Sequence, residues 1–140
     1  MPVDQASQLR EEPDHYVLPL VGGTVDQLNV DFAFTLVIDG AHSVRIACPM
    51  RYHDGEQEHH IDPSDVDQLL PLLHLHQATV IEATASKLGT LVVHFDGGRS
   101  IVVDADVDYE AWEVNGGMPP ITPDYQLVCL PGGGVDADEG

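Results

Sequence analysis

The stretch that decides the fold is TLVVHFDGGRSIVVD, residues 90–104. Apolar and β-branched residues alternate with polar ones on either side of Asp96-Gly97-Gly98, a pattern typical of half-buried strands. Glycine in the turn supplies the positive φ that a tight hairpin requires. The pattern predicts a hairpin of strands 90–95 and 99–104, with Ile101 and Val103 on the core side.

A similar pattern occurs earlier in the chain, where residues of about 24–48 match residues of about 79–104. Thr24-Val25 matches Thr79-Val80, and Ser43-Val44-Arg45-Ile46 matches Ser100-Ile101-Val102-Val103. Each copy predicts three strands, and Val44 and Ile46 should be buried in the same sense as Ile101 and Val103. Two copies are too few for a solenoid, so they predict a roll or barrel-like sheet.

One short helix is expected between the copies. Ser64 is its predicted N-cap, with Asp67 in the capping-box position, and the helix should end near Leu75. Two more strands, 109–114 and 125–130, follow the second copy. The predicted fold class is therefore mostly β (α+β): two three-stranded antiparallel meanders in a roll or barrel-like sheet, one short helix between them, and a C-terminal strand pair.

The chain of 140 residues has the length of one domain. Residues 1–15 predict a flexible acidic arm, residues 16–130 a single β-rich domain, and residues 131–140 a disordered, acidic, glycine-rich tail. The N-terminus lacks the pattern of an export signal, and the apolar stretches are too short to cross a bilayer. A cytoplasmic location is the expectation.

The charge balance excludes several partners. With 24 Asp and Glu against 5 Lys and Arg, the net charge of −19 opposes binding to nucleic acid or anionic membrane. No nucleophile or phosphate-binding motif is present, so no catalytic residue, cofactor or enzyme activity is predicted. Cys48 and Cys129 have neither redox nor zinc spacing, and we expect both to be buried thiols.

Histidine and carboxylate side chains provide an alternative site. His53, His59, His60 and Asp62 lie close together in the sequence, and imidazole with carboxylate is a ligand set of zinc. The competing interpretation is a polar hairpin around Asp54-Gly55, because neighbouring histidines on a strand point to opposite faces.

Two further groups are candidates for partner contact. Asp104, Asp106 and Asp108 begin like a calcium loop, but the glycine and the final glutamate of that motif are missing, which favours an exposed acidic strand end. Phe32 and Phe34 stand where the second copy has its turn. If exposed they mark a binding surface, and otherwise they continue the inward face of a strand.

The leading hypothesis is a non-catalytic module that binds a basic protein partner through its acidic surface, as an immunity-type or regulatory protein does. One alternative is a metal protein or enzyme that uses the histidine region. The other is a barrel that holds a small apolar ligand, which needs an interior cavity of at least roughly 300 Å³.

The chain also resembles a family of small actinobacterial proteins of unknown function. The most specific parts are Tyr109-Glu110-Ala111-Trp112-Glu113 and Leu130-Pro131-Gly132-Gly133. The resemblance covers about residues 17–133, and the sequence departs from the family in the proline-rich insert 118–123 and in its acidic C-terminal extension. The resemblance implies the domain boundaries but no activity, cofactor or site residue.

Overall fold

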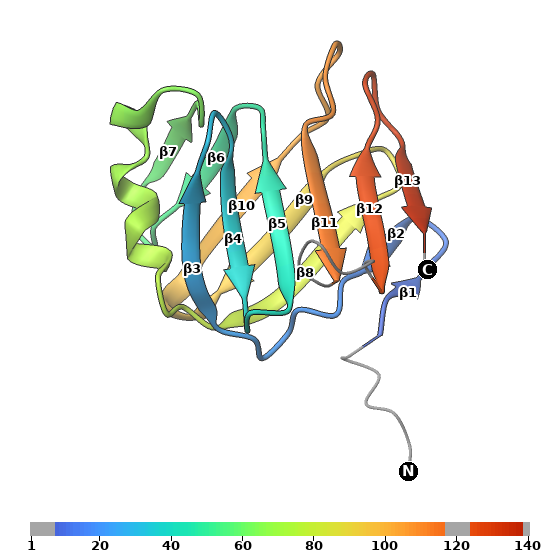
Figure 1. Ribbon diagram of the computed structural model, residues 1–140, viewed down its shortest axis with the longest axis horizontal. Helices are drawn as coiled ribbons and strands as arrows, with labels where there is room; N and C mark the ends of the chain where they lie inside the picture. The colour runs from blue at the N-terminus through green and yellow to red at the C-terminus, as the bar shows by residue number, and fades with distance from the viewer. Residues whose placement is uncertain (1–7, 117–123, 139–140) are drawn as a thin grey trace.

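The computed structural model describes residues 8–116 and 124–138. They form two antiparallel sheets, of seven and six strands, that pack face to face as a sandwich (Figure 1). The mostly β fold class is thereby confirmed. The sheets form two separate layers with free edges and do not close into a barrel.

The six-stranded sheet contains the first meander and the C-terminal strands. Its strands in spatial order are β13 (Val135–Asp138), β12 (Tyr125–Cys129), β11 (Trp112–Gly116), β5 (His42–Ile46), β4 (Phe34–Ile38) and β3 (Val25–Val30). The expected C-terminal strand pair is confirmed as β11 and β12, which are antiparallel neighbours.

The seven-stranded sheet contains the second meander. Its strands in spatial order are β1 (Arg10–Glu11), β2 (His15–Val17), β8 (Val80–Ser86), β9 (Leu91–Phe95), β10 (Arg99–Val103), β6 (Met50–His53) and β7 (Glu58–Ile61). The hairpin predicted from residues 90–104 is β9 and β10, joined through the short turn η4 (Asp96–Gly98), in which Gly97 has a φ of 77°.

The two meanders have the same internal geometry. Each is a run of three antiparallel strands, β3–β4–β5 in one sheet and β8–β9–β10 in the other. The register shifts after the first paired residue in both, between Val25 and Gln27 and between Val80 and Glu82. This shared bulge puts the inward faces of both meanders in the same phase.

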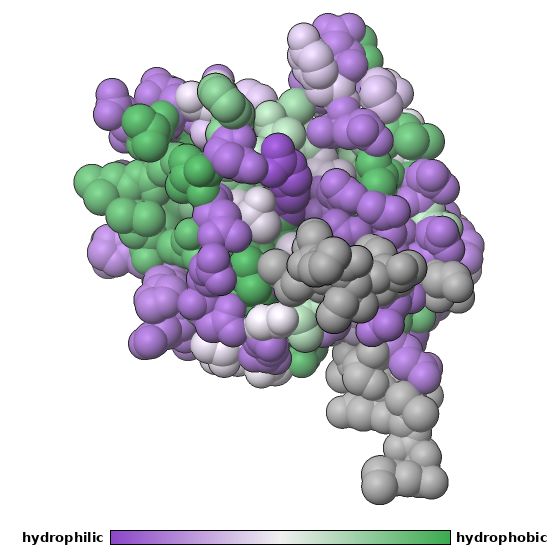
Figure 2. Space-filling view, in the orientation of Figure 1, coloured by the Kyte–Doolittle hydropathy of each residue, from purple (hydrophilic) through white to green (hydrophobic). Residues whose placement is uncertain are grey.

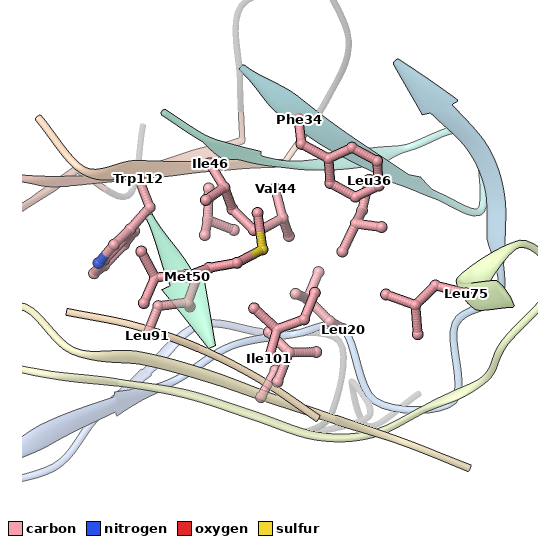
Figure 3. Close-up of a cluster of buried hydrophobic side chains, with 14 of the residues drawn as sticks. Leu20, Phe34, Leu36, Val44, Ile46, Met50, Leu75, Leu91, Ile101 and Trp112 are labelled. Atoms are coloured by element: carbon pink, nitrogen blue, oxygen red, sulfur yellow. The ribbon is translucent and has the colours of Figure 1, made fainter. Parts of the chain in front are cut away.

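The core fills the space between the sheets. Val44, Ile46, Ile101 and Val103 are all fully buried, as the matched pattern predicts. Figure 3 shows several of these side chains meeting between the two layers. Trp112 is also buried there, and its indole Nε1 donates to the carbonyl of Gly89 at 2.8 Å.

The helix between the meanders is of the 3₁₀ type and has two parts, η2 (Val66–Gln68) and η3 (Leu70–Leu75). Asp65 is the N-cap, because its side chain accepts the amide of Asp67, so the predicted Ser64 cap is wrong. Pro71 has no N–H and clashes with the preceding turn of an α-helix, which explains the tighter, interrupted form.

The two ends of the described chain carry more structure than expected. Val135–Asp138 pairs with β12, so the prediction of a disordered tail is wrong for these residues. Backbone pairing with an edge strand needs few apolar side chains, and here Val135 and Ala137 also pack against the core. In the arm, Arg10–Glu11 pairs with residues 16–17. The insert 118–123 lies outside the described residues.

Candidate protein-binding surface

The β3–β4 hairpin places its two phenylalanines in opposite environments. Phe34 begins β4 opposite Ile46 and is fully buried, so the proposed role of Phe34 in partner contact is wrong. Phe32 occupies the tip between the strands and is 89% exposed. The hairpin therefore presents one aromatic ring to solvent and uses the other as core.

The backbone at Phe32 is strained. Its φ of 72° lies in the left-handed region, which costs a side chain without local hydrogen bonding about 1 kcal/mol or more. At the β8–β9 turn, the counterpart in the second meander, glycine takes the positive φ, with Gly89 at 109°. The first meander thus keeps a large apolar side chain where glycine or asparagine would be less strained.

The hairpin tip is held by its own backbone and by one ion pair. The amide of Asp31 donates to the carbonyl of Ala33 at 3.0 Å, and Arg45 Nη1 donates to Asp31 Oδ1 at 2.9 Å. Because both side chains of the ion pair are partly exposed, it adds little stability. It joins the tip to a side chain of β5.

The 3₁₀ geometry divides the leucines of η3 into two stripes. With three residues per turn, Leu69, Leu72 and Leu75 lie on one face, and all three are buried. Leu70 and Leu73 occupy the neighbouring stripe and are 68% and 48% exposed. An α-helix would have joined these leucines into one broad face, so the exposed stripe follows from the tighter helix.

We define the rim patch as five exposed apolar residues on this side of the sandwich: Val30, Phe32, Val66, Leu70 and Leu73. Figure 2 shows apolar side chains gathered over η2, η3 and the adjoining strand β3. Figures 1 and 3 both place η3 beside β3, at the free edge of the six-stranded sheet.

Chain geometry explains why the patch is continuous. The amide of Gln77, just beyond η3, donates to the carbonyl of Val25 at 2.6 Å, so the end of η3 is anchored at the start of β3. From this anchor β3 rises about 3.4 Å per residue. The 3₁₀ segments run beside it in the opposite direction at about 2 Å per residue. The start of η2 therefore lies toward the hairpin end of β3 (Figure 1).

Carboxylates surround the rim patch. Asp31 lies at the hairpin tip, Asp65 lies just before η2, and Asp67 lies within η2. All three are exposed. Residues 21–44 and 62–86, which carry the whole patch, contain no Lys or Arg. Arg45, which pairs with Asp31, is the cation that the structure places at the tip. Near the other end of η3, Arg99 donates to the carbonyl of His74 and pairs with Asp96. The patch is thus an apolar surface bordered mainly by carboxylates.

Asp104 and Asp106 are engaged within the fold. Asp104 accepts from Arg51 Nη2 at 3.0 Å and from the Thr90 hydroxyl at 3.1 Å. Asp106 Oδ2 accepts the amides of Asp108 and Tyr109. These bonds organise the loop after β10, and Asp108 is exposed within it.

A second exposed apolar group lies where three loops meet. The carbonyls of Leu88 and Asp106 accept the amides of Gly134 and Gly132, which ties the β8–β9 turn and the loop after β10 to the β12–β13 turn. We call this group the loop corner, and its exposed members are Leu88, Val107, Tyr109 and Leu130. It provides a natural control surface for the rim patch.

The histidine candidates are not assembled into one site. His59 Nε2 lies 2.9 Å from Asp54 Oδ2, whereas His60 Nε2 lies 3.4 Å from Glu58 Oε2. His53 Nδ1 accepts the amide of Gly55, and Asp62 accepts from the Ser64 amide and hydroxyl. Within residues 8–116 and 124–138, no group of three His, Cys, Asp or Glu has metal-binding geometry.

These local bonds stabilise the β6–β7 turn. The amides of Gln57 and Glu56 and the ring of His59 all donate to Asp54 and hold the pKa of its carboxyl far below its usual range. The two bonds from Ser64 lower the pKa of Asp62 in the same way. The expected polar hairpin is therefore present, with its carboxylates and histidines used as turn-forming groups.

Three further observations concern a surface hollow, the two thiols and membrane spans. A hollow of about 370 Å³ opens on the seven-stranded sheet, and its lining combines polar side chains such as Arg51 and Asp104 with apolar ones such as Met50 and Val102. Cys48 and Cys129 are both buried and free, as predicted, and burial raises the pKa of each thiol.

In the described part of the chain, no helix is long and apolar enough to span a bilayer.

Residues 16–137 match the pattern of a family of unknown function, DUF6188. The chain belongs to this family. No curated protein and no solved structure matches the chain. The family match agrees with the boundaries expected from the resemblance, and it assigns no residue a role.

Sequence reasoning missed three members of the rim patch in this family member: Val66, Leu70 and Leu73. The signal that could have revealed two of them is the pair of leucine doublets around Pro71, Leu69-Leu70 and Leu72-Leu73. A proline-interrupted helix of this length can bury only one stripe, so adjacent leucines leave one of each doublet in solvent.

Proposed function

We propose that this protein is a non-catalytic binding module that engages a basic protein partner through its acidic surface. The observation that carries the proposal is Phe32, an aromatic ring that is 89% exposed on a strained backbone. Strain of this kind concentrates at functional sites, and large exposed aromatics are typical anchors of protein interfaces. An exposed ring adds nothing to the core that would offset the strain.

The net charge supports the identity of the partner. A charge of −19 attracts a basic surface over several ångströms and accelerates its association, especially at low ionic strength. The same field repels nucleic acids and anionic surfaces. Apolar anchors among carboxylates suit a partner that offers apolar side chains together with Lys or Arg.

Affinity capture from a native lysate tests the proposal. The immobilised protein should retain at low ionic strength a partner that raised salt releases, because screening weakens the attraction. Mass spectrometry should identify this partner as basic, and isothermal titration calorimetry with the two purified proteins should confirm direct binding. Retention of no partner, or of an acidic partner insensitive to salt, contradicts the proposal.

A further inference from the structure

We propose that the partner docks on the rim patch, Val30, Phe32, Val66, Leu70 and Leu73, with a surface whose apolar side chains are flanked by Lys or Arg. This inference rests on the proposed function and deepens it by naming the contact surface. The patch joins the hairpin tip, the edge strand β3 and the exposed stripe of η3.

The residues of the patch come from two separate segments of the chain, 30–32 and 66–73, yet they form one strip. Val30 and Phe32 lie at the tip of the β3–β4 hairpin, and the 3₁₀ segments run antiparallel to β3 toward their anchor at Val25 (Figure 1). The strip therefore offers an aromatic anchor at one end and two leucines along its length. Interfaces commonly have such an apolar centre with a polar rim.

The charges beside the strip specify the partner. Asp31 lies at the hairpin tip, and Asp65 and Asp67 lie at the start of the 3₁₀ segments. The segments that carry the strip contain no Lys or Arg. A second copy of this chain would bring like charges together across the interface, which is unfavourable. A partner with cationic side chains around its apolar anchors complements the surface instead.

The loop corner differs from the rim patch in its charge and in its backbone strain. Lys87, beside Leu88 in the β8–β9 turn, places a cation there, and the left-handed position of that turn is taken by Gly89. The two turns are counterparts in their meanders, so Leu88→Ser is a matched control for changes in the rim patch. Leu88 is 83% exposed, as Phe32 is 89% exposed, so neither change should disturb the core.

The first test measures affinity for the purified partner captured with the wild-type protein. Phe32→Asn and Leu70→Ser should each weaken binding about 30-fold, the effect of losing an interface hot spot, whereas Leu88→Ser should change it less than about 3-fold. Asp67→Asn should weaken binding at low ionic strength by a few-fold, and the difference should vanish at raised salt.

The second test locates the contact directly. A photo-crosslinking amino acid at position 70 should form an adduct with the same purified partner, and one at position 88 should not. Adducts through position 88 alone, or unchanged affinity of the Phe32 and Leu70 variants, overturn the docking surface while the proposed function stands. A dimer of this chain that Leu70→Ser dissociates overturns the basic partner, and the absence of any partner contradicts both proposals.

Discussion

Thr24 and Thr79 face each other as an isolated antiparallel bridge that links the two sheets of the sandwich. Around this bridge the amide of Val25 donates to Ala78 and the amide of Val80 donates to Gly23, both at 2.9 Å. Each threonine amide also donates to the aspartate that directly follows the second strand of its own meander. The same set of bonds is thus made twice, once in each sheet.

The paired aspartates should contribute comparable stability. Asp39 Oδ1 accepts the amide of Thr24 at 3.0 Å, and Asp96 Oδ1 accepts the amide of Thr79 at 3.1 Å. Alanine at either position should lower the free energy of unfolding by about 1 kcal/mol, and by somewhat more at position 39, where φ is 55°.

Urea denaturation checks this symmetry. Asparagine keeps the acceptor oxygen, so Asp39→Asn and Asp96→Asn should stay within about 0.5 kcal/mol of wild type. If one alanine variant were neutral while the other lost more than about 2 kcal/mol, the two turns would not be equivalent.

The buried indole of Trp112 should contribute more to stability than either aspartate. Trp112→Phe removes the bond from Nε1 to Gly89 and leaves a cavity beside the carbonyl, so we expect a loss of about 2–3 kcal/mol. Circular dichroism during chemical denaturation measures it. Tyr109→Phe, at a site 68% exposed, is the control and should change stability by less than about 0.5 kcal/mol. A neutral Trp112 variant contradicts the packing described.

The local sequence pattern predicts much of this fold because a hairpin pairs strands that are close together in the sequence. Asp96-Gly97-Gly98 and the flanking alternation define β9 and β10, and the matching residues define β4 and β5. The order of strands within each sheet depends on non-local pairings, such as β11 with β5 and β10 with β6, which no local pattern encodes. The weakly apolar strand β13 escaped prediction for the same reason, since its partner β12 supplies the pairing.

The candidate surface was only partly predictable. Phe32 and Phe34 are two residues apart, and which of them faces the core depends on where the hairpin turns, because a one-residue change in the turn reverses the faces. Similarly, the exposed Leu70 and Leu73 follow from three residues per turn in η3, whereas an α-helical period hides them.

His42 should make stability depend on pH. Its Nδ1 lies 3.0 Å from the Tyr125 hydroxyl, and burial lowers the pKa of His42 below 6.5, although Asp39 and Asp124 oppose that shift. The unfolded state therefore takes up a proton first as pH falls, so the contribution of His42 to stability decreases below a pH of about 6.5.

The comparison of variants isolates this contribution from the titration of the many carboxylates. As pH falls from about 7.5 to about 5, the unfolding free energy of wild type should fall relative to that of His42→Gln. A difference for His42 that does not change with pH contradicts the assignment.

The proposed docking depends most on Phe32 serving contact with a partner and not the fold. Urea denaturation of the purified Phe32→Asn variant tests it directly, since asparagine tolerates the left-handed backbone and the exposed ring buries little surface. We expect the variant to be as stable as wild type or more stable, by up to about 1 kcal/mol. A loss of more than about 1 kcal/mol would show that the ring supports the fold and would contradict the claim.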